Sequence, residues 1–131
     1  MTDLVRVTDV MTHSIHKIAR TATVQDAIDM MRGHTTGSLA VERRDKNDEY
    51  GLISVSDIAA KVMAEDRSPD RVNVYEVMSK PVITVHGDMD IRYAMRLLTK
   101  FHVSRAMVLD EKREPMGIVT LRDMVFRPYE V

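Results

Sequence analysis

The stretch Gly51-Leu-Ile-Ser-Val-Ser-Asp57 returns later in the chain as Gly117-Ile-Val-Thr-Leu-Arg-Asp123. Each stretch closes a block of about sixty residues, and the two blocks open on similar segments, Val7-Thr-Asp-Val-Met11 and Val74-Tyr-Glu-Val-Met78. Residues 7–41 align with 74–108 at an offset of 67, which becomes 66 from Gly51 onward. The chain is therefore a duplication, and a repeated unit of this kind predicts two copies that pack together.

Within each copy the hydrophobic pattern changes its period in the same order. Alternating β-prone runs at 15–18 and 82–85 predict short strands. Apolar residues with helical spacing follow, and Thr23 and Asp90 are the expected N-caps of the two helices. The apolar positions are Val24, Ala27, Ile28 and Met31 in copy one, and Ile91, Ala94, Met95 and Leu98 in copy two.

Each copy continues with two β-prone runs joined by a polar loop, which predicts a hairpin. The paired runs are 39–42 with 50–54 and 106–109 with 115–120. A last helix is expected to begin at each motif Asp, and a short helical turn is expected at the start of each copy.

Both copies thus have the order β-α-β-β-α, so the predicted fold class is α+β. We expect copy one and its N-terminal lead-in within residues 1–66. Copy two, with the linker and the C-terminal tail, is expected within 67–131. A block of about sixty residues is only marginally stable alone, so we expect the copies to share one core.

The composition excludes several classes of protein. The formal net charge is −1, whereas nucleic-acid binding requires a concentrated basic surface. No apolar run approaches the roughly 20 residues of a membrane helix, and the N-terminus lacks a secretion-signal pattern. The absence of cysteine fits a reducing compartment. We therefore expect a cytoplasmic protein without nucleic-acid or membrane partners.

The duplicated Gly-apolar-x-Ser/Thr-x-x-Asp motif, some forty residues after a Val-Met start, resembles the tandem CBS domain pair, named after cystathionine β-synthase. The resemblance covers nearly all of residues 7–126. It implies a Bateman-type module, in which two repeats form a pseudo-twofold pair with two clefts between them. It also implies sensing of adenosine-containing ligands, namely AMP, ADP or ATP, with NAD(H) or S-adenosylmethionine as further candidates.

Such modules commonly form homodimers through their helices. Met30 beside Met31, and Leu97 beside Leu98, widen the apolar faces of the two long helices. A deeply buried helix and a subunit contact both explain such a face. The output of the module is expected to pass to a separate, unknown effector protein.

Ser54-x-x-Asp57 and Thr120-x-x-Asp123 have the form of a capping box, which is a purely structural explanation of the motif. Two features favour a ligand instead. The motif recurs in both copies, and the preceding glycine leaves the strand end uncovered for close approach of a ligand. A carboxylate accepts hydrogen bonds from two neighbouring hydroxyls, as a ribose offers. We expect Asp57 and Asp123 to bind ribose, with Ser54 and Thr120 toward the ribose-phosphate end.

The resemblance also implies a cation for the phosphate, supplied by the other repeat at the start of its second strand. Arg105 matches this position in copy two, whereas its counterpart in copy one is Ser38. A guanidinium suits phosphate because its donors form a fixed fork. We expect Arg105 to serve the cleft of Asp57, so that this cleft prefers phosphate-rich nucleotides. A solubilising role on an edge strand is the alternative.

The base is expected in an apolar slot next to the strand that begins each repeat. The resemblance assigns eleven residues to the two slots: Met11, Ser14, His16, Thr36, Gly37 and Ser38 in copy one, and Met78, Pro81, Ile83, Val103 and Ser104 in copy two. His16 stands where copy two has Ile83, so the first slot is predicted to be wetter or pH-dependent.

No catalytic motif, catalytic cofactor or dedicated metal site is indicated by the sequence. Magnesium is expected only together with a nucleotide, held mainly by the phosphates. Two other functions stay open. One is a dimeric adaptor without ligand, in which both Asp residues only cap helices. The other, least favoured, is an enzyme that processes a nucleotide.

Overall fold

The computed structural model describes residues 4–80 and 82–129, which divide into two compact units. The central unit is His16–Val82, and the terminal unit combines Met1–Ile15 with Ile83–Val131. Each unit contains one three-stranded sheet and several helices, which confirms the predicted α+β class. Pro81, predicted for a base slot, lies outside the described residues.

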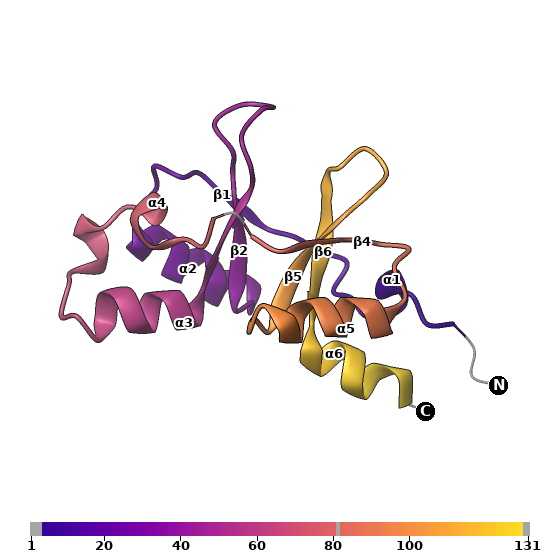
Figure 1. Cartoon of the computed structure of the whole chain (residues 1–131). Helices are drawn as coiled ribbons and strands as arrows, with labels where there is room; N and C mark the ends of the chain where they lie inside the picture. The colour runs from indigo at the N-terminus through magenta and orange to yellow at the C-terminus, as the bar shows by residue number, and fades with distance from the viewer. Residues whose placement is uncertain (1–3, 81, 130–131) are drawn as a thin grey trace. The chain divides into compact units, whose positions relative to one another are not determined.

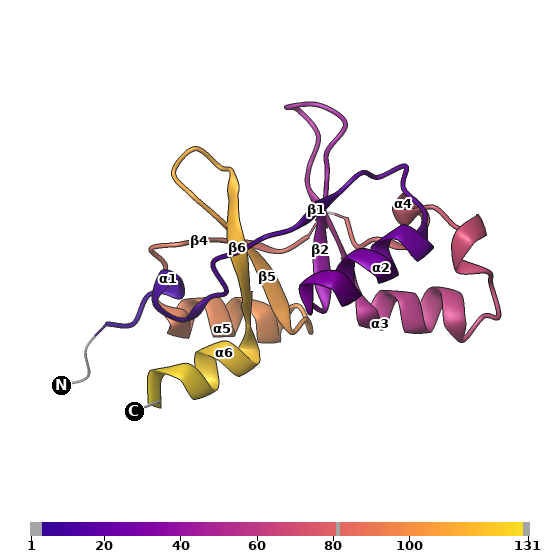
Figure 2. The ribbon, with the colours of Figure 1, turned by 180° about the vertical axis from the view of Figure 1, so that it is seen from behind.

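The central unit is built on a mixed sheet with the strand order β1-β2-β3 (Figure 1). Strand β1 runs parallel to β2, and β2 runs antiparallel to β3. Helix α2 contacts β2 and runs beside it (Figure 2). The elements in chain order are β1 (Lys17–Ile18), α2 (Val24–His34), β2 (Ser38–Val41), β3 (Gly51–Ser54), α3 (Val55–Ile58), the π-helical η1 (Ala59–Met63), the 3₁₀ turn η2 (Pro69–Arg71) and α4 (Val74–Val77).

The terminal unit repeats this plan with the strand order β4-β5-β6. Strand β4 is parallel to β5, and β5 and β6 form the predicted antiparallel hairpin. Its elements are α1 (Val7–Val10), β4 (Thr84–His86), α5 (Ile91–Lys100), β5 (Arg105–Leu109), β6 (Pro115–Thr120), α6 (Leu121–Phe126) and the 3₁₀ turn η3 (Arg127–Tyr129).

The predicted caps of the two long helices are confirmed. Thr23 Oγ1 accepts a hydrogen bond from the Asp26 amide, and Asp90 Oδ1 accepts one from the Arg92 amide. The predicted start of the last helices was wrong by two residues. They begin at Val55 and Leu121 because the hydroxyl residue before each is the N-cap, which places the motif Asp in the first turn. The first strands are also shorter or shifted, at Lys17–Ile18 and Thr84–His86.

The lead-in segments are exchanged between the copies. Helix α1 belongs to copy one in sequence, but it lies in the terminal unit with the sheet of copy two. Helix α4 begins copy two and lies in the central unit with the sheet of copy one. The sequence copies and the compact units are therefore different divisions of the chain.

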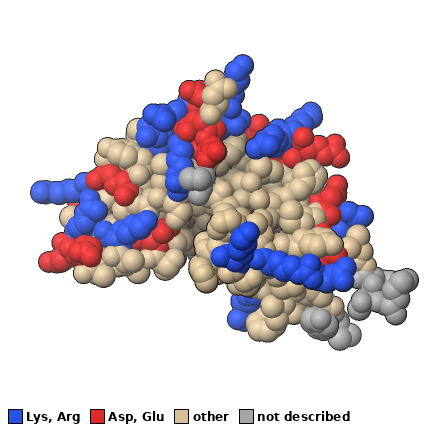
Figure 3. Space-filling view, viewed as in Figure 1, with Lys and Arg blue, Asp and Glu red and all other residues tan. Residues whose placement is uncertain are grey.

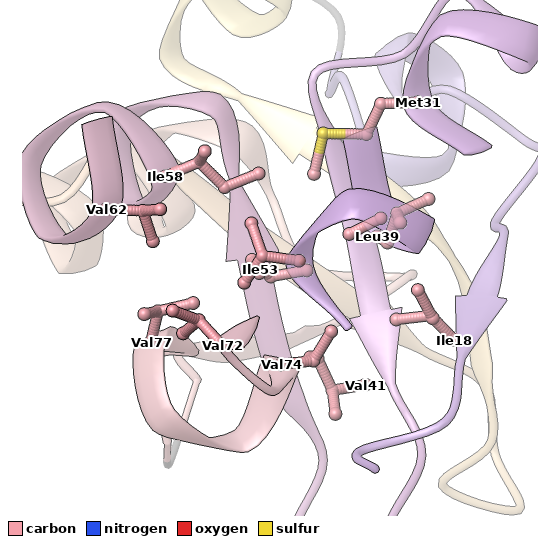
Figure 4. Packing of buried hydrophobic residues seen from close by; sticks show 12 residues of the cluster. Ile18, Met31, Leu39, Val41, Ile53, Ile58, Val62, Val72, Val74 and Val77 are labelled. Carbon is pink, nitrogen blue, oxygen red and sulfur yellow. The ribbon is translucent and has the colours of Figure 1, made fainter. Parts of the chain in front are cut away.

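Each unit has its own hydrophobic core, so the prediction of a single shared core was wrong. In the central unit, Val72, Val74 and Val77 of copy two pack with residues of copy one such as Ile53 (Figure 4). In the terminal unit, Val7, Val10 and Met11 of copy one join a core formed by copy two. Both cores draw on both copies because the lead-in helices bring apolar side chains across.

Candidate functional site

The strand-to-helix junction of copy one is a complete capping box around Ser54 and Asp57. Ser54 Oγ accepts a hydrogen bond from the Asp57 amide at 3.2 Å, and Asp57 Oδ2 accepts one from the Ser54 amide at 3.0 Å. The Ser54 hydroxyl also donates to Oδ2 at 3.0 Å. Serine and carboxylate therefore hold each other in one arrangement before any ligand is considered.

Thr120 and Asp123 form the same box in copy two. Thr120 Oγ1 accepts from the Asp123 amide at 3.0 Å, and Asp123 Oδ2 accepts from the Thr120 amide at 3.2 Å. Both carboxylates are largely shielded, because the Asp57 side chain is 17% exposed and the Asp123 side chain 16%. The capping role that the sequence offered as an alternative is confirmed, and it uses only one oxygen of each carboxylate.

A cation lies beside the second oxygen at both junctions. Lys61 Nζ is 3.7 Å from Asp57 Oδ1, and Arg127 Nε is 3.3 Å from Asp123 Oδ1. The same cations bond to the lead-in segments, since Lys61 donates to the Val77 carbonyl at 3.0 Å and Arg127 to the Met11 carbonyl at 3.4 Å. Sequence reasoning missed both cations, although the spacing Asp-x-x-x-Lys/Arg occurs in both copies.

The explanation given for the motif glycines was wrong. Gly51 and Gly117 do not leave the strand end open, because the lead-in of the other copy covers it. Ser79 and Leu52 exchange backbone hydrogen bonds beside Gly51 at 2.8 and 3.0 Å. A Cβ at Gly51 would lie 2.8 Å from Met78 Sδ, and a Cβ at Gly117 would overlap the Thr12 carbonyl oxygen. Glycine at these two positions therefore lets the backbone of the lead-in segment approach closely.

Arg105 is half-buried and lies opposite Thr120 in the β5–β6 hairpin, within the terminal unit. Ser38, its counterpart, lies opposite Ser54 in the central unit. Paired residues of antiparallel strands have neighbouring side chains. The start of each second strand is thus next to its own junction. The predicted service of Arg105 to Asp57 joins residues of different units and stays a prediction.

The described base-slot residues fall into both units. Met11 is buried and Ser14 exposed in the terminal unit, whereas the partners predicted for them belong to the central unit. Met78 lies in the central unit, while the other described residues of its slot lie in the terminal unit. The predicted partners of Met11 and Ser14, in the central unit, are His16, Thr36, Gly37 and Ser38. The predicted partners of Met78, in the terminal unit, are Ile83, Val103 and Ser104.

Two predicted slot residues, Gly37 and Ser104, contact the strand-to-helix junctions directly. Gly37 and Ser104 each offer their carbonyl to the first amide of the following helix, at 3.0 Å from Val55 and 2.9 Å from Leu121. These bonds fasten the start of the second strand to the motif in both units. The slot edge and the motif are therefore placed together by backbone, independently of side-chain identity.

His16 has a partner that the sequence did not indicate. Its ring stacks on that of His34, at the end of α2, with the centroids 3.7 Å apart and the planes 13° from parallel. His16 and His34 align with Ile83 and Phe101 of copy two, so both positions of this imidazole pair have apolar residues in copy two. The predicted difference between the two slots thus extends to a second residue.

Within residues 4–80 and 82–129, no three His, Asp or Glu side chains gather closely enough to hold a metal ion. Over the same residues, no helix is long and apolar enough to cross a membrane.

Comparison with known proteins gives the family. The CBS domain family model matches residues 7–64 and 74–129. An uncharacterized protein of Methanopyrus kandleri is 34% identical over 102 residues, which are 77% of this chain and 52% of that protein. The chain thus spans about half the length of this relative.

Two solved structures show the same fold. The hexameric CBS-CP12 protein of bloom-forming cyanobacteria is 31% identical with a TM-score of 0.91, covering 96% of this chain and 72% of that one. A CBS domain protein of Pyrobaculum aerophilum, solved in complex with AMP, is 19% identical with a TM-score of 0.80, covering 93% and 92%. With both repeats matched by the family model and by these folds, the chain belongs to the CBS domain family as a tandem pair.

Proposed function

We propose that this CBS pair is a regulatory module that binds an adenosine-containing ligand at its two Ser/Thr-x-x-Asp junctions. The observation that carries the proposal is that the two oxygens of each motif carboxylate have different partners. Oδ2 of Asp57 and of Asp123 holds the cap, while Oδ1 lies beside a cation and has lone pairs for a ribose hydroxyl. A capping box alone does not require a cation at that oxygen in both copies.

The ligand class rests on the family. The Pyrobaculum aerophilum protein that shares this fold is complexed with AMP. We propose AMP, ADP or ATP as the ligand, and NAD(H) and S-adenosylmethionine as the further members of the same class. Magnesium would accompany a nucleotide through the phosphates rather than through a protein site.

Each predicted residue keeps its role in the proposal. Asp57 and Asp123 bind the ribose, and Ser54 and Thr120 face its phosphate end. Arg105 supplies positive charge for the phosphate, and Lys61 and Arg127 supply further positive charge. The base slots consist of the lead-in residues and second-strand starts named above, with Pro81 among them.

The module is regulatory rather than catalytic in this proposal. Binding would change the conformation of the lead-in segments, because the junction cations donate hydrogen bonds to their carbonyls. A separate effector protein would respond to that change. We also propose a cytoplasmic protein that forms a homodimer through its helices.

One observation favours a second candidate, a dimeric adaptor without ligand. The capping boxes already give Ser54, Asp57, Thr120 and Asp123 hydrogen-bond partners within the chain, so the motif has a structural use even if nothing binds.

A thermal-shift panel of AMP, ADP, ATP, NAD(H) and S-adenosylmethionine separates the two candidates. A ligand at a hundredfold excess over its Kd stabilises the folded state by ~2.7 kcal/mol, roughly 10 °C for a chain of this size. We expect one or more of these ligands to raise Tm, with uridine monophosphate as the control. No shift with any of the five would refute the ligand-binding module and favour the adaptor.

A further inference from the structure

The terminal unit has an open cavity at the end of its sheet that lies away from the junction of Thr120 and Asp123. Its volume is about 410 Å³, which is within the range of small-molecule sites. Strand β6 passes the cavity at Met116, near its start, and ends at Thr120 in the junction. The cavity and the junction are therefore separate places in the same unit.

The aligned positions of the central unit hold a cation of the chain itself. The Thr8 amide donates to the Gly87 carbonyl at 3.0 Å, and the Tyr75 amide donates to the Arg20 carbonyl at 3.0 Å. These pairs align at the offset of 67, so the two backbones correspond. In the central unit the Arg20 guanidinium carbon lies over the Tyr75 ring, 5.2 Å from its centroid. Glycine and threonine, which line the cavity of the terminal unit, provide neither the cation nor the ring.

A second arginine and tyrosine pair differs between the units in the same way. The Arg43 guanidinium carbon lies over the Tyr50 ring, 4.7 Å from its centroid. With the offset of 67 extended past residue 41, and that of 66 extended back to residue 50, Arg43 aligns with Asp110 and Tyr50 with Met116. Both Asp110 and Met116 line the cavity. The terminal unit thus has a carboxylate where the central unit has a guanidinium.

The charge of the cavity wall is mainly negative. Glu111 aligns with Arg44 at the same offset, which is a second reversal of charge. In Figure 3 acidic and basic side chains lie together at the tip of the β5–β6 hairpin, whose loop forms one side of the cavity. The lining contains three carboxylates, one ammonium and one imidazole, which belong to Asp88, Asp110, Glu111, Lys112 and His86.

Asp110 is held in a fixed orientation by its own loop. Its Oδ1 accepts hydrogen bonds from the Lys112 amide at 2.8 Å and from the Glu114 amide at 2.9 Å. Over residues 4–80 and 82–129, no Lys or Arg forms an ion pair with the carboxylate of Asp110 or Glu111. Carboxylates at a concave surface that have no counterion within the chain attract a cation from solution.

We propose that this cavity binds a cationic group on an aliphatic chain, either an alkylammonium or a guanidinium. The proposal goes beyond the proposed function and does not depend on it. The carboxylates of Asp110 and Glu111 hold the charge, while Leu109 and Met116 contact the aliphatic part. A bare metal ion fits less well, because no three His, Asp or Glu side chains of the described residues gather around one point. Both a free polyamine and a Lys or Arg side chain of a partner protein carry this chemistry.

Two probes distinguish these sources, and both are titrated into the ¹⁵N-labelled full chain. Spermidine represents the free polyamine, and the capped peptide acetyl-Ala-Arg-Ala-amide represents the side chain of a partner. We expect saturable amide shifts at Gly87, Asp88 and residues 110–112, with a millimolar or lower Kd. The probe that binds more tightly identifies the source. The same peptide with citrulline in place of arginine keeps the shape without the charge and should cause no saturable shifts.

Conservative variants test the role of the carboxylates. Asp110→Asn keeps an oxygen for the two loop amides, and Glu111→Gln changes an exposed side chain, so the fold is retained. The double variant D110N/E111Q is expected to weaken binding of the tighter probe roughly fivefold. Glu111→Arg, which introduces the residue type of copy one, should weaken it at least as much as Glu111→Gln. Asp45→Asn is the matched control, because Asp45 also accepts a loop amide, that of Asn47, in the other hairpin.

Three results would overturn the proposal. The first is the absence of saturable shifts at the cavity with both probes. The second is a Kd that D110N/E111Q leaves unchanged, or that D45N raises equally, since binding would then be a general attraction to acidic surface. The third is a citrulline peptide that binds as tightly as the arginine peptide. Nucleotide binding at the junctions is measured with other ligands and is decided by none of these results.

Discussion

The Asp123 carboxylate lies 3.3 Å from Nε of Arg127, and the Arg127 guanidinium also donates to a carbonyl 116 residues earlier in the chain, that of Met11. One side chain therefore joins the motif of copy two to the lead-in of copy one. Asp57 and Lys61 repeat the arrangement with the Val77 carbonyl. A ligand that competes for either carboxylate would act on a lead-in segment through this cation.

The role of the carboxylates can be separated from capping. We expect Asp57→Asn and Asp123→Asn each to weaken adenosine-ligand binding at its own junction by about tenfold or more, since a hydrogen bond to a charged group contributes roughly 1.5–3 kcal/mol. Isothermal titration calorimetry measures the loss. Asp26→Asn is the matched control, because Thr23 and Asp26 form the same capping box without a proposed ligand. Equal losses in all three variants would assign the effect to helix capping.

The motif glycines should differ in their tolerance of a methyl group. Gly117→Ala places Cβ against the Thr12 backbone and is expected to lower the free energy of unfolding by roughly 1–3 kcal/mol. Gly51→Ala should cost less, because its nearest atom is the flexible Met78 side chain. Gly33→Ala, in open space on α2, should stabilise by about 0.5–1 kcal/mol. Denaturant unfolding gives the three values, and a harmless Gly117→Ala would contradict the close approach of Thr12.

Arg105 is expected to recognise phosphate and not the nucleoside. Arg105→Ala should weaken ATP roughly tenfold and leave adenosine affinity within twofold, since only the charged contacts are removed. Combining it with Asp57→Asn and, separately, with Asp123→Asn identifies the junction that Arg105 serves, because coupled residues give non-additive losses. An Arg105→Ala variant whose ATP affinity is unchanged would mean that Arg105 contacts no ligand and acts as a solubilising strand residue.

Asp48, in the hairpin loop of copy one, is expected to make the stability of the fold depend on pH. The Arg44 amide and the Lys80 ammonium, 2.6 Å from Asp48, hold the pKa of the Asp48 carboxyl well below its usual range. A lowered pKa stabilises the fold above the unfolded-state value of about 3.9, and the contribution fades as the pH falls further toward the folded-state value. Asp48→Asn should therefore lower Tm at neutral pH, and the gap to wild type should narrow below about pH 4. A gap that is constant with pH would contradict the pairing.

Local pattern was enough for the elements of the fold. Helical spacing located α2 and α5, and Thr23 and Asp90 were the right caps, because these signals depend only on residues a few positions apart. The hairpins followed from β-prone runs on either side of a polar loop. The family resemblance followed from the same local motifs, since the duplication repeats them in order.

The exchange of the lead-in segments between the copies could not be predicted from the sequence. A four-residue helix such as α1 or α4 has the same pattern whichever sheet it packs on, so nothing local indicated that α1 belongs with copy two. The misassigned glycines follow from that gap, because the segment that covers Gly51 and Gly117 comes from the other copy. Lys61 and Arg127 were the exception, because their spacing from the motif Asp was visible in both copies and was overlooked.

The central claim is that an adenosine ligand binds at the two junctions, and amide chemical shifts test it most directly. ¹⁵N-labelled chain is titrated with AMP and, in parallel, with the other four ligands of the panel. The account predicts saturable shifts concentrated at Ser54–Asp57 and Thr120–Asp123, with smaller shifts at Met11 and Val77, whose carbonyls the junction cations hold. The absence of shifts with all five ligands, or shifts confined to residues far from both junctions, would contradict it.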